Sequence, residues 1–392
     1  MNRWSRPWNV VGAGLAGAVL ARELAERTDS PVLVLEERDH VAGLCHTERD
    51  PETGVLVHRC GSHIFHSEDE RAWRFLSRFA DMRPCQHRVG AVNRRGRFPL
   101  PINLTTINRF FGVDFDADQA RAFIDSRADK HVTDPSNLEE QFLAQYGREL
   151  YEAFFYGYSK KHWGCEPREL PASVASRQRL RFDDDDRYFQ DRFEGIPADG
   201  YTDSVRRMLD HEKIAVQTHC SARPGDLDRH RHLFWTGPLD AYFEHRHGRL
   251  SYRTVTWLEE RASGDVQGTS VLNYTELDVP HTRIHEHKHL APWEDHQGSV
   301  IHTEFSKATG PEDDPAYPRC LSADEDACSR YMAEAAKLTD VSFLGRLGTY
   351  RYLDMDQVIK ESLEMADRTV TALARDLPLP LFPASLSRGN PH

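Results

Sequence analysis

The chain has 392 residues, of which 39% are hydrophobic, and a formal net charge of −12 at pH 7. Because this length exceeds one ordinary domain, we expect roughly two or three subdomains, and the negative charge argues against binding to nucleic acid or to acidic membrane surfaces. The 7 cysteines include no CxxC pair, which favours free thiols in a reducing compartment. No apolar run reaches the length of a membrane span, so we expect a cytoplasmic protein without a membrane partner.

The chain opens with a strand, a glycine turn, a helix and a second strand. Residues 9–11 end a short apolar strand, residues 18–26 have the small and apolar side chains of a packed helix, and residues 31–35 form the second apolar strand. The turn carries Gly12, Gly14 and Gly17 in the spacing GxGxxG. These glycines permit a tight turn, the approach of a pyrophosphate and close helix–strand packing, and the helix N-terminus offers free N–H groups to phosphate. The pattern predicts a Rossmann-type dinucleotide site.

The next residues suggest which dinucleotide binds. Glu36 ends the second strand, where a carboxylate can accept hydrogen bonds from ribose hydroxyls. The fingerprint lies at the start of the chain, and a second stretch from Glu37 to Gly43 also contains a glycine, which together favour FAD over NAD. In this segment we expect the cofactor to contact Gly12, Gly14, Ala16, Gly17, Glu36, Glu37 and Gly43.

Periodicity divides the rest of the chain. Helical spacing from about residue 116 to 163 predicts a helical insertion, and short alternating runs from about 188 to 303 predict strands. Residues 356–375 form a closing amphipathic helix, and residues 377–392, rich in Pro and Ser, form a loose tail. The acidic run at 183–186 is interpreted as a solvated turn.

Several longer segments are similar to those of one family. They are VHRCGSHIFH at 57–66, ELYEAFFYGY at 149–158, KHWG at 161–164, TGPLD at 236–240 and GRLGTYRYLDM at 345–355. Together with the glycine turn, and in this order along most of the chain, they resemble the UDP-galactopyranose mutases.

The resemblance implies an α/β fold with three parts. The first is a Rossmann-like FAD-binding domain made of residues 1–85 with about 210–245 and 335–392. The second is an inserted helical domain, about 100–180, with a mobile substrate loop. The third is an antiparallel β-sheet substrate domain made of about 86–100, 181–209 and 246–334.

The resemblance also implies an isomerase that converts a nucleoside-diphosphate hexopyranose to its furanose form in polysaccharide or glycoconjugate biosynthesis. In this family N5 of reduced FAD attacks the anomeric carbon and expels the nucleoside diphosphate, and a flavin–iminium intermediate then recloses as a furanose. The implied external reductant is NAD(P)H or reduced flavin, and the implied assembly is a homodimer.

The matching positions imply roles for individual residues. The catalytic set is His63 and His66, which face the flavin, with Arg177 and Arg283, which clamp the diphosphate because an arginine fork pairs two phosphate oxygens. Arg177 is expected on the mobile loop. The implied substrate-binding residues are His87, Phe154, Phe155, Tyr158, Trp163, Tyr188, Arg253, Asn273, Tyr317 and Tyr352. Further implied cofactor contacts are Leu44, His63, Ile64, Arg346, Asp354 and Met355.

The chain departs from the family pattern at four positions. Leu44 and His87 stand where relatives often have Asn, while Ala316 and His281 stand where relatives often have Tyr. These changes lie on the substrate side, whereas the arginines and the glycine turn are retained. We therefore hypothesise that the reaction is kept but that the sugar or the base differs, for example a 6-deoxy sugar, an amino sugar or another nucleotide.

Two other functions share parts of this sequence pattern. A flavin-dependent oxidoreductase of the amine oxidase type would have the same glycine turn, and a nucleotide-sugar-binding homologue without catalysis would have the same motifs. The spacing of His285, His287 and His289 could hold a metal on one face of a strand, but no cysteine or carboxylate cluster accompanies them with zinc-site spacing, so we expect no metal.

Overall fold

A five-stranded parallel sheet forms from the predicted opening unit. The computed structural model describes residues 7–177, 179–223 and 231–387. The sheet has the order β10 (Ile214–Gln217), β2 (Val32–Leu35), β1 (Trp8–Val11), β11 (His232–Trp235) and β17 (Val341–Phe343). All four strand pairs are parallel. The strands and the helix expected at residues 9–35 are confirmed.

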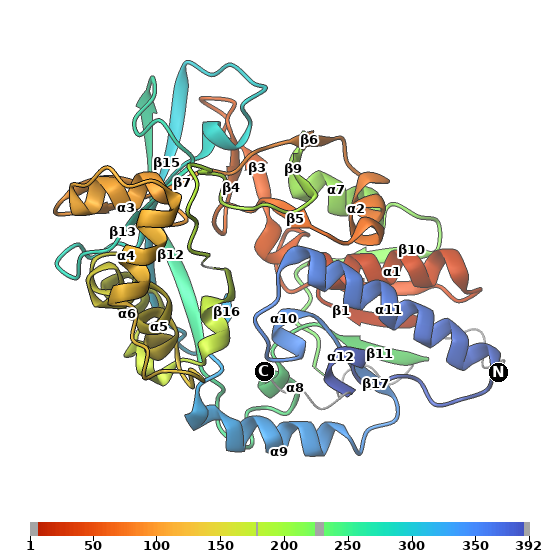
Figure 1. The fold of residues 1–392 in the computed structure, drawn as a ribbon. Helices are drawn as coiled ribbons and strands as arrows, with labels where there is room; N and C mark the ends of the chain where they lie inside the picture. The colour runs from red at the N-terminus through yellow and green to blue at the C-terminus, as the bar shows by residue number, and fades with distance from the viewer. Residues whose placement is uncertain (1–6, 178, 224–230, 388–392) are drawn as a thin grey trace.

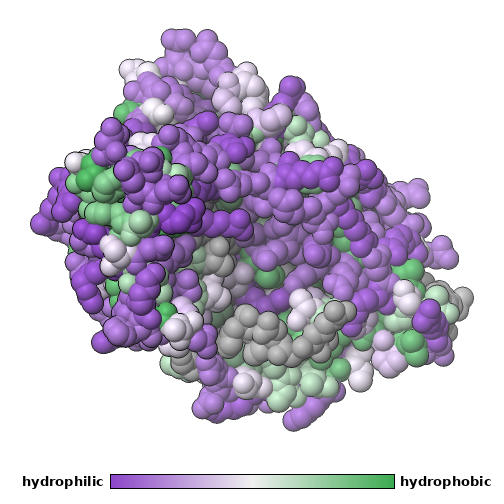
Figure 2. Space-filling view, viewed as in Figure 1, coloured by the Kyte–Doolittle hydropathy of each residue, from purple (hydrophilic) through white to green (hydrophobic). Residues whose placement is uncertain are grey.

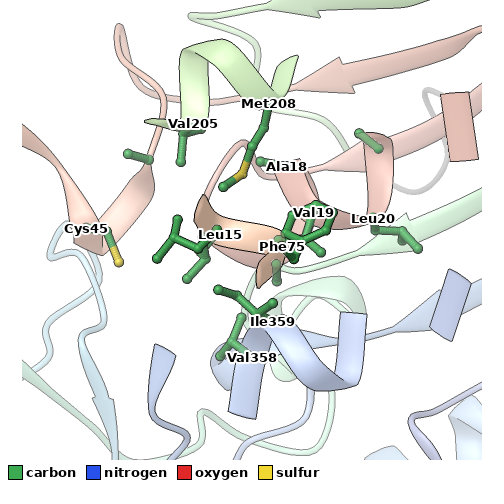
Figure 3. Packing of buried hydrophobic residues seen from close by; sticks show 14 of the residues in the cluster. Leu15, Ala18, Val19, Leu20, Cys45, Phe75, Val205, Met208, Val358 and Ile359 are labelled. Atoms are coloured by element: carbon green, nitrogen blue, oxygen red, sulfur yellow. The ribbon is translucent and has the colours of Figure 1, made fainter. Parts of the chain in front are cut away.

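Four helices build the core beside this sheet: α1 (Leu15–Arg27), α2 (Glu70–Ser77), α7 (Gly200–Leu209) and α11 (Met355–Ala374). Leu15 and Val19 of α1 point toward Val358 and Ile359 of α11, with Phe75 of α2 beside them (Figure 3). The long helix α11 runs along α1 across the parallel sheet (Figure 1). This packing buries the apolar stripe of each helix and fixes the first turns of α1 and α11.

A seven-stranded sheet forms the second lobe (Figure 1). Every neighbouring pair is antiparallel except β13 with β7. Its order is β16 (Tyr317–Pro318), β12 (Tyr252–Ser263), β15 (Gly298–Ala308), β14 (Arg283–Glu286), β13 (Val271–Tyr274), β7 (Val89–Asn93) and β8 (Gly96–Leu100).

Helices cover this sheet around an aromatic cluster. They are α3 (Leu104–Phe111), α4 (Ala117–Arg127), α5 (Leu138–Leu150), the π-helical turn η3 (Tyr151–Tyr156) and α6 (Gly157–Trp163). The face seen in Figure 2 is mainly hydrophilic, and hydrophobic side chains gather over this helical part.

Shorter strands, helices and turns make up the rest of the described structure. The strands are β3 (Thr47–Arg49), β4 (Leu56–His58), β5 (Phe65–Ser67), β6 (Met82–Pro84) and β9 (Phe193–Pro197). The helices and single turns are η2 (Gly43–Cys45), η4 (Pro167–Glu169), η5 (Ala172–Arg177), α8 (Leu239–Tyr242), η7 (His287–Leu290), η8 (Ser322–Asp324), α9 (Glu325–Ala335), α10 (Gly345–Gly348) and α12 (Ala384–Ser387). No helix in the described ranges combines the length and the apolarity that crossing a bilayer requires.

The boundary expected at 181–209 needs correction. β9 pairs with β5 and β6 in a separate small sheet, and α7 packs on α1. Tyr201, Val205 and Met208 recur at helical spacing and join the core of the parallel-sheet lobe. Residues 193–209 therefore belong to the dinucleotide-binding lobe, because their apolar stripe is buried there and not on the seven-stranded sheet.

The expectation of a loose tail is wrong for residues 377–387. The main-chain N–H of Phe343 donates to Leu381 O at 2.8 Å, and the Ser342 hydroxyl donates to Pro380 O. Phe382 stacks on Phe343 with ring centroids 5.6 Å apart. The segment covers the edge strand β17, which satisfies main-chain groups that would otherwise be unpaired.

Replacing Phe382 by Ala should lower the free energy of unfolding by about 2–3 kcal/mol, because its ring leaves a packed contact with Phe343. Urea unfolding measures the change. Leu377→Ala is the matched control, since Leu377 is 55% exposed and its loss should cost less than about 0.5 kcal/mol. Equal effects of the two substitutions would contradict the docking of this segment.

Candidate functional site

A cavity of about 990 Å³ lies at the carboxyl ends of the parallel strands. Val11, Leu35 and Trp235, which end β1, β2 and β11, line it. Ligands of open α/β sheets bind at this edge. The predicted cofactor residues that line the cavity are Gly12, Gly14, Ala16, Glu36, Glu37, Gly43, Leu44, His63, Arg346 and Met355.

The three glycines of the turn have different surroundings. A Cβ on Gly17 would lie 2.0 Å from Gly12 O, so Gly17 permits close packing of α1 on the turn. Gly12 has a φ of +98°, and a Cβ there would lie 2.1 Å from the Thr236 hydroxyl. A Cβ on Gly14 would meet nothing nearer than Gly43 Cα at 3.8 Å, and both of these glycines line the cavity. Gly14 therefore leaves room for an external group, as a pyrophosphate cradle requires.

The acidic and helical parts of the cavity also fit a dinucleotide. Glu36 is buried and accepts the main-chain N–H of Ala13 at 2.7 Å, which holds its carboxylate at the cavity wall. Asp354 caps α11, and Met355 and Val358 of its first turn line the cavity. The positive end of the helix dipole is thus directed at the site. Ile64 and Gly17 are buried behind the wall and support it without lining it.

Arg346 connects the cavity to a second group of residues. Its guanidinium donates to Leu353 O from Nε at 3.1 Å and Nη2 at 2.6 Å. The same group lies 5.4 Å from the ring centroid of Tyr317 and 5.1 Å from that of Tyr352. A fixed positive charge therefore lies between the dinucleotide cavity and an aromatic cluster.

Arg283 is the charged centre of the second group. Its Nε donates to Glu304 Oε1 at 2.8 Å. Glu304 is 1% exposed and also accepts from the Thr282 hydroxyl at 2.7 Å and from His285 at 3.2 Å. Burial raises the pKa of Glu304, but Arg283 and His285 outweigh burial and hold that pKa below its usual range. Within the described residues, the terminal nitrogens of Arg283 make no hydrogen bond, so they remain able to bind an anion.

Tyr158 and Tyr317 lie near this arginine, and other aromatic rings pack against both. The Tyr317 ring lies 5.7 Å from Tyr352 and 6.5 Å from Trp163, and Tyr158 stacks on His162 at 5.6 Å. Burial raises the pKa of Tyr317 to about 12 and raises that of Tyr158 further, although Arg283 opposes the shift. Their hydroxyls therefore stay protonated near neutral pH and can donate hydrogen bonds.

The predicted histidines occupy different environments. His63 lines the cavity and its Nδ1 lies 2.6 Å from Gly61 O, while burial lowers its pKa to about 4. His87 packs against Tyr188 at 5.7 Å, and burial lowers its pKa to about 3. His66 lies outside the cavity lining, where it stacks on Phe189 and pairs with Asp191 at 2.8 Å. His63 and His87 are thus neutral rings, and only His63 reaches the cavity.

Arg253 has a different environment from Arg283. It is 5% exposed, and its Nε donates to His162 O at 2.9 Å and to the Ser306 hydroxyl at 3.0 Å. Lys161 next to it donates to the carbonyls of Tyr274, Val279 and His281. The two cations attach the end of α6 to the sheet. Arg253 therefore positions the aromatic side chains of α6 by holding the backbone of that helix.

The remaining predicted substrate residues are placed as follows. Phe154 packs on Phe98 and Phe110, and Phe155 stacks on Phe142, so both rings are in the core of the helical part. Asn273 lies opposite Arg283 in the sheet, and its buried Oδ1 has no partner among the described residues. Arg177 ends η5, but its side chain lies outside the described residues.

Glu304, His162 and Lys161 contact predicted site residues but were not singled out from the sequence. In the sequence, the signal for Glu304 is a charged residue in an otherwise strand-like run. The β14–β15 register of the structure places this residue opposite Arg283. The histidines whose spacing was weighed and set aside as a metal site have other partners: His285 bonds to Ser62 and Glu304, and the main-chain N–H of His58 donates to His287. Among the described residues, Asp265, Glu286 and His289 lie close enough together to share a metal ion. The Lys288 ammonium, 3.8 Å from Glu286, already supplies a positive charge there.

Comparisons with known proteins show which family the chain belongs to. The family model for UDP-galactopyranose mutase matches residues 153–352, and a model for an NAD(P)-binding Rossmann-like domain matches residues 10–79. The Klebsiella pneumoniae protein named "Probable UDP-galactopyranose mutase" is 44% identical over 373 residues, which cover 95% of this chain and 97% of that protein. The chain belongs to the UDP-galactopyranose mutase family.

Another curated protein and two solved structures are also similar to this chain. The dTDP-fucopyranose mutase of Escherichia coli is 40% identical, over 91% of this chain and 96% of its own. The crystal structure of a reduced UDP-galactopyranose mutase superposes with a TM-score of 0.73 at 15% identity, covering 95% of both chains. A putrescine oxidase superposes with a TM-score of 0.56 at 13% identity, covering 94% of this chain and 99% of that one, which is a likeness of fold. The predicted family and α/β fold class are confirmed.

Alanine at Gly17 should lower stability, whereas alanine at Gly14 should weaken cofactor binding. Gly17→Ala should lower the stability of the cofactor-free protein by about 1–3 kcal/mol, because its methyl group meets Gly12 O. Gly14→Ala should leave that stability within about 0.5 kcal/mol but weaken binding of the dinucleotide at least about tenfold, because its methyl group enters the cavity. Thermal unfolding and cofactor titration separate the two, and normal dinucleotide binding by Gly14→Ala would contradict the assigned cradle.

The buried histidines should make folding sensitive to mild acid. Burial lowers the pKa of His58, His87 and His287 in the fold, whereas the unfolded value is about 6.5. Below pH 6.5 the unfolded chain binds more protons, so stability is highest above that pH and falls as the pH drops. Each such ring lowers the free energy of unfolding by up to about 1.4 kcal/mol per pH unit. Urea unfolding at pH 7.5, 6.5 and 5.5 measures this, and equal stability at 7.5 and 5.5 would refute it.

Proposed function

We propose that this protein isomerises a nucleoside-diphosphate hexose between its pyranose and furanose forms. The observation that carries the proposal is Arg283, which is anchored through Nε by the buried Glu304 and keeps its terminal nitrogens uncommitted among the described residues. Arg346 links this group to the dinucleotide cavity. The proposal is supported by family membership and by relatives that are named as mutases.

Arg283 would hold the diphosphate through the reaction. The bond between the anomeric carbon and the diphosphate must break and form again, so the departing group must stay in place. A guanidinium fork suits this task because it binds two phosphate oxygens and stays charged throughout. Fixing Nε on Glu304 limits the rotation of the group, which lowers the entropy lost on binding.

The aromatic hydroxyls and His63 would complete the site. Tyr158 and Tyr317 keep their protons, so they can donate hydrogen bonds to the oxygens that gain charge when the bond breaks. His63 is a neutral ring at the cavity wall and can exchange a proton with the sugar-ring oxygen. Trp163, packed against Tyr317 and Tyr352, would offer a flat apolar wall to the base.

The cofactor that we propose for the cavity is FAD. In its reduced form, bound FAD supplies the nucleophile for the anomeric carbon, and NAD(P)H or free reduced flavin would supply the electrons. The first turn of α11 and Arg346 place positive charge at the same end of the cavity, which favours an anionic reduced ring. A homodimer and a cytoplasmic location stay predictions.

UDP-galactopyranose is the first candidate substrate, and a dTDP-linked 6-deoxy sugar is the second. The first follows the Klebsiella relative and the second the Escherichia coli relative. The changed residues His87 and Leu44 support a change of substrate, because His87 packs on the predicted substrate residue Tyr188 and Leu44 lines the cavity. His281 supports it less, since its ring packs on Tyr274 at the end of a hairpin.

The FAD-loaded, dithionite-reduced protein should convert at least one sugar of a panel of UDP-, dTDP- and GDP-hexoses without consuming NADPH or oxygen. Chromatography of the sugars against time measures the conversion. Consumption of NADPH or oxygen in proportion to product would favour an oxidase of the amine oxidase type. Binding of a nucleotide-sugar without conversion would favour a binding protein.

Arg283→Lys should reduce kcat/KM at least about 100-fold, because lysine keeps the charge but loses both the Nε contact to Glu304 and the fork. The matched control is Arg94→Lys, since the Arg94 side chain is 74% exposed and far less committed to the fold. If Arg283→Lys retained wild-type kcat/KM, the proposed clamp would be wrong.

A further inference from the structure

A series of three hydrogen bonds, one buried and two partly buried, connects Arg283 to the cavity loop, which is residues 59–64 between β4 and β5. Arg283 Nε donates to Glu304 Oε1 at 2.8 Å, and Glu304 Oε2 lies 3.2 Å from His285 Nε2. The other ring nitrogen of His285 lies 2.7 Å from the Ser62 hydroxyl. Ser62 directly precedes His63, which lines the dinucleotide cavity. The chain therefore joins the two halves of the site.

The sheet places the first three members of the chain side by side. Arg283 and Glu304 are direct partners across β14 and β15, and His285 is two residues further along β14, on the same face as Arg283. Trp257 lies opposite Glu304 on β12, and its ring contacts that of His285 edge to face at 5.3 Å. Packing and register thus hold the His285 ring between Glu304 and Ser62.

The chemistry of the chain assigns a direction to each hydrogen bond. The carboxylate of Glu304 only accepts, so His285 donates to it from Nε2. Burial lowers the pKa of His285 below its usual value, so the ring is neutral and its Nδ1 accepts from the Ser62 hydroxyl. Each buried polar atom along the chain has a partner, which is the condition under which a buried network rigidifies a site.

Ser62 lies in the cavity loop, at the other end of this series of hydrogen bonds. Hydrogen bonds also hold both of its sequence neighbours, Gly61 and His63. The main-chain N–H of His63 donates to His58 Nδ1 at 3.1 Å, and Gly61 O lies 2.6 Å from His63 Nδ1. Gly61 has a φ of +101°, a conformation that other residues rarely adopt. The Ser62 hydroxyl links this loop to His285 of β14, and Arg59 of the same loop pairs with Glu259 of β12.

We infer that His285 and Ser62 are positioning residues that fix the diphosphate clamp Arg283 relative to the cavity loop that carries His63. Without His285, Glu304 would lose one of its three side-chain donors and could rotate, and the guanidinium on its Oε1 would rotate with it. Without Ser62, the loop would lose its bond to His285. The inference rests on the proposed function, because it assigns Arg283 to a diphosphate.

The test compares four single variants of the FAD-loaded protein with the wild type. Ser62→Ala removes the hydroxyl, and His285→Leu removes both ring nitrogens at similar volume. His285→Gln keeps a donor for Glu304 and an acceptor for Ser62. His289→Gln is the matched control, since His289 contacts Asp265 at the far end of the same segment. UDP affinity is measured by calorimetry, KM and kcat with the converted nucleotide-sugar, and melting temperature by thermal unfolding.

Ser62→Ala and His285→Leu should weaken UDP binding about fivefold to tenfold and raise KM by a similar factor, as expected for one lost buried hydrogen bond. His285→Gln and His289→Gln should stay within about twofold of the wild type. The double variant Ser62→Ala with His285→Leu should bind UDP no more weakly than His285→Leu alone, because both substitutions break the same chain.

Unchanged UDP affinity in Ser62→Ala and His285→Leu would overturn the inference, as would a loss in His285→Gln equal to that in His285→Leu. A lower melting temperature with unchanged UDP affinity and KM would also overturn it, because that result describes a structural role only. If His285→Leu does not fold, Ser62→Ala and His285→Gln still decide. A wild-type protein that neither binds UDP nor converts any nucleotide-sugar would instead refute the proposed function.

Discussion

The ion pair between Arg283 and Glu304 constrains the arrangement of the substrate side. A carboxylate that is 1% exposed is costly unless its charge is paired and its oxygens are hydrogen-bonded. The β14–β15 register meets this requirement by placing Arg283 opposite Glu304 and His285 beside it. The requirement has a functional consequence, because an arginine held through Nε presents its terminal nitrogens in a fixed direction. We propose that this buried pair, which the fold must satisfy, also prepares an anion site.

The dinucleotide side depends on a different constraint, which is the absence of side chains at the glycine turn. Gly17 lets α1 pack on the turn, and Gly14 leaves the cavity open beside Gly43. Arg346 joins the two sides, since it lines the cavity and lies over Tyr317 and Tyr352. Residues from the parallel-sheet lobe and from the seven-stranded sheet therefore meet at one place, as a reaction between a bound cofactor and a bound nucleotide-sugar requires.

The elements that the sequence predicted correctly are those whose formation depends on residues close together in the chain. The opening strand–turn–helix unit and the closing helix follow from apolar periodicity and glycine spacing, and both were predicted within a few residues. The sequence did not reveal that α7 packs on α1 or that residues 377–387 cover β17, because these contacts join segments that are distant in the chain.

The same limit applies to the site. Motifs assigned Arg283, Tyr158 and Tyr317 to the substrate and Arg346 to the cofactor, but they could not show which partners each arginine binds. Arg253 donates to main-chain carbonyls of α6 and Arg283 to a carboxylate, a difference that only the strand register determines. Likewise Phe154 lies in a core while Tyr158 lies beside Arg283, although both belong to one aromatic run.

A crystal structure of the FAD-loaded protein with bound UDP tests the central claim most directly. The account predicts diphosphate oxygens about 3 Å from the terminal nitrogens of Arg283, with Nε still on Glu304 and His285 still between Glu304 and Ser62. A diphosphate bound elsewhere, with the terminal nitrogens of Arg283 turned away from it, would contradict the account.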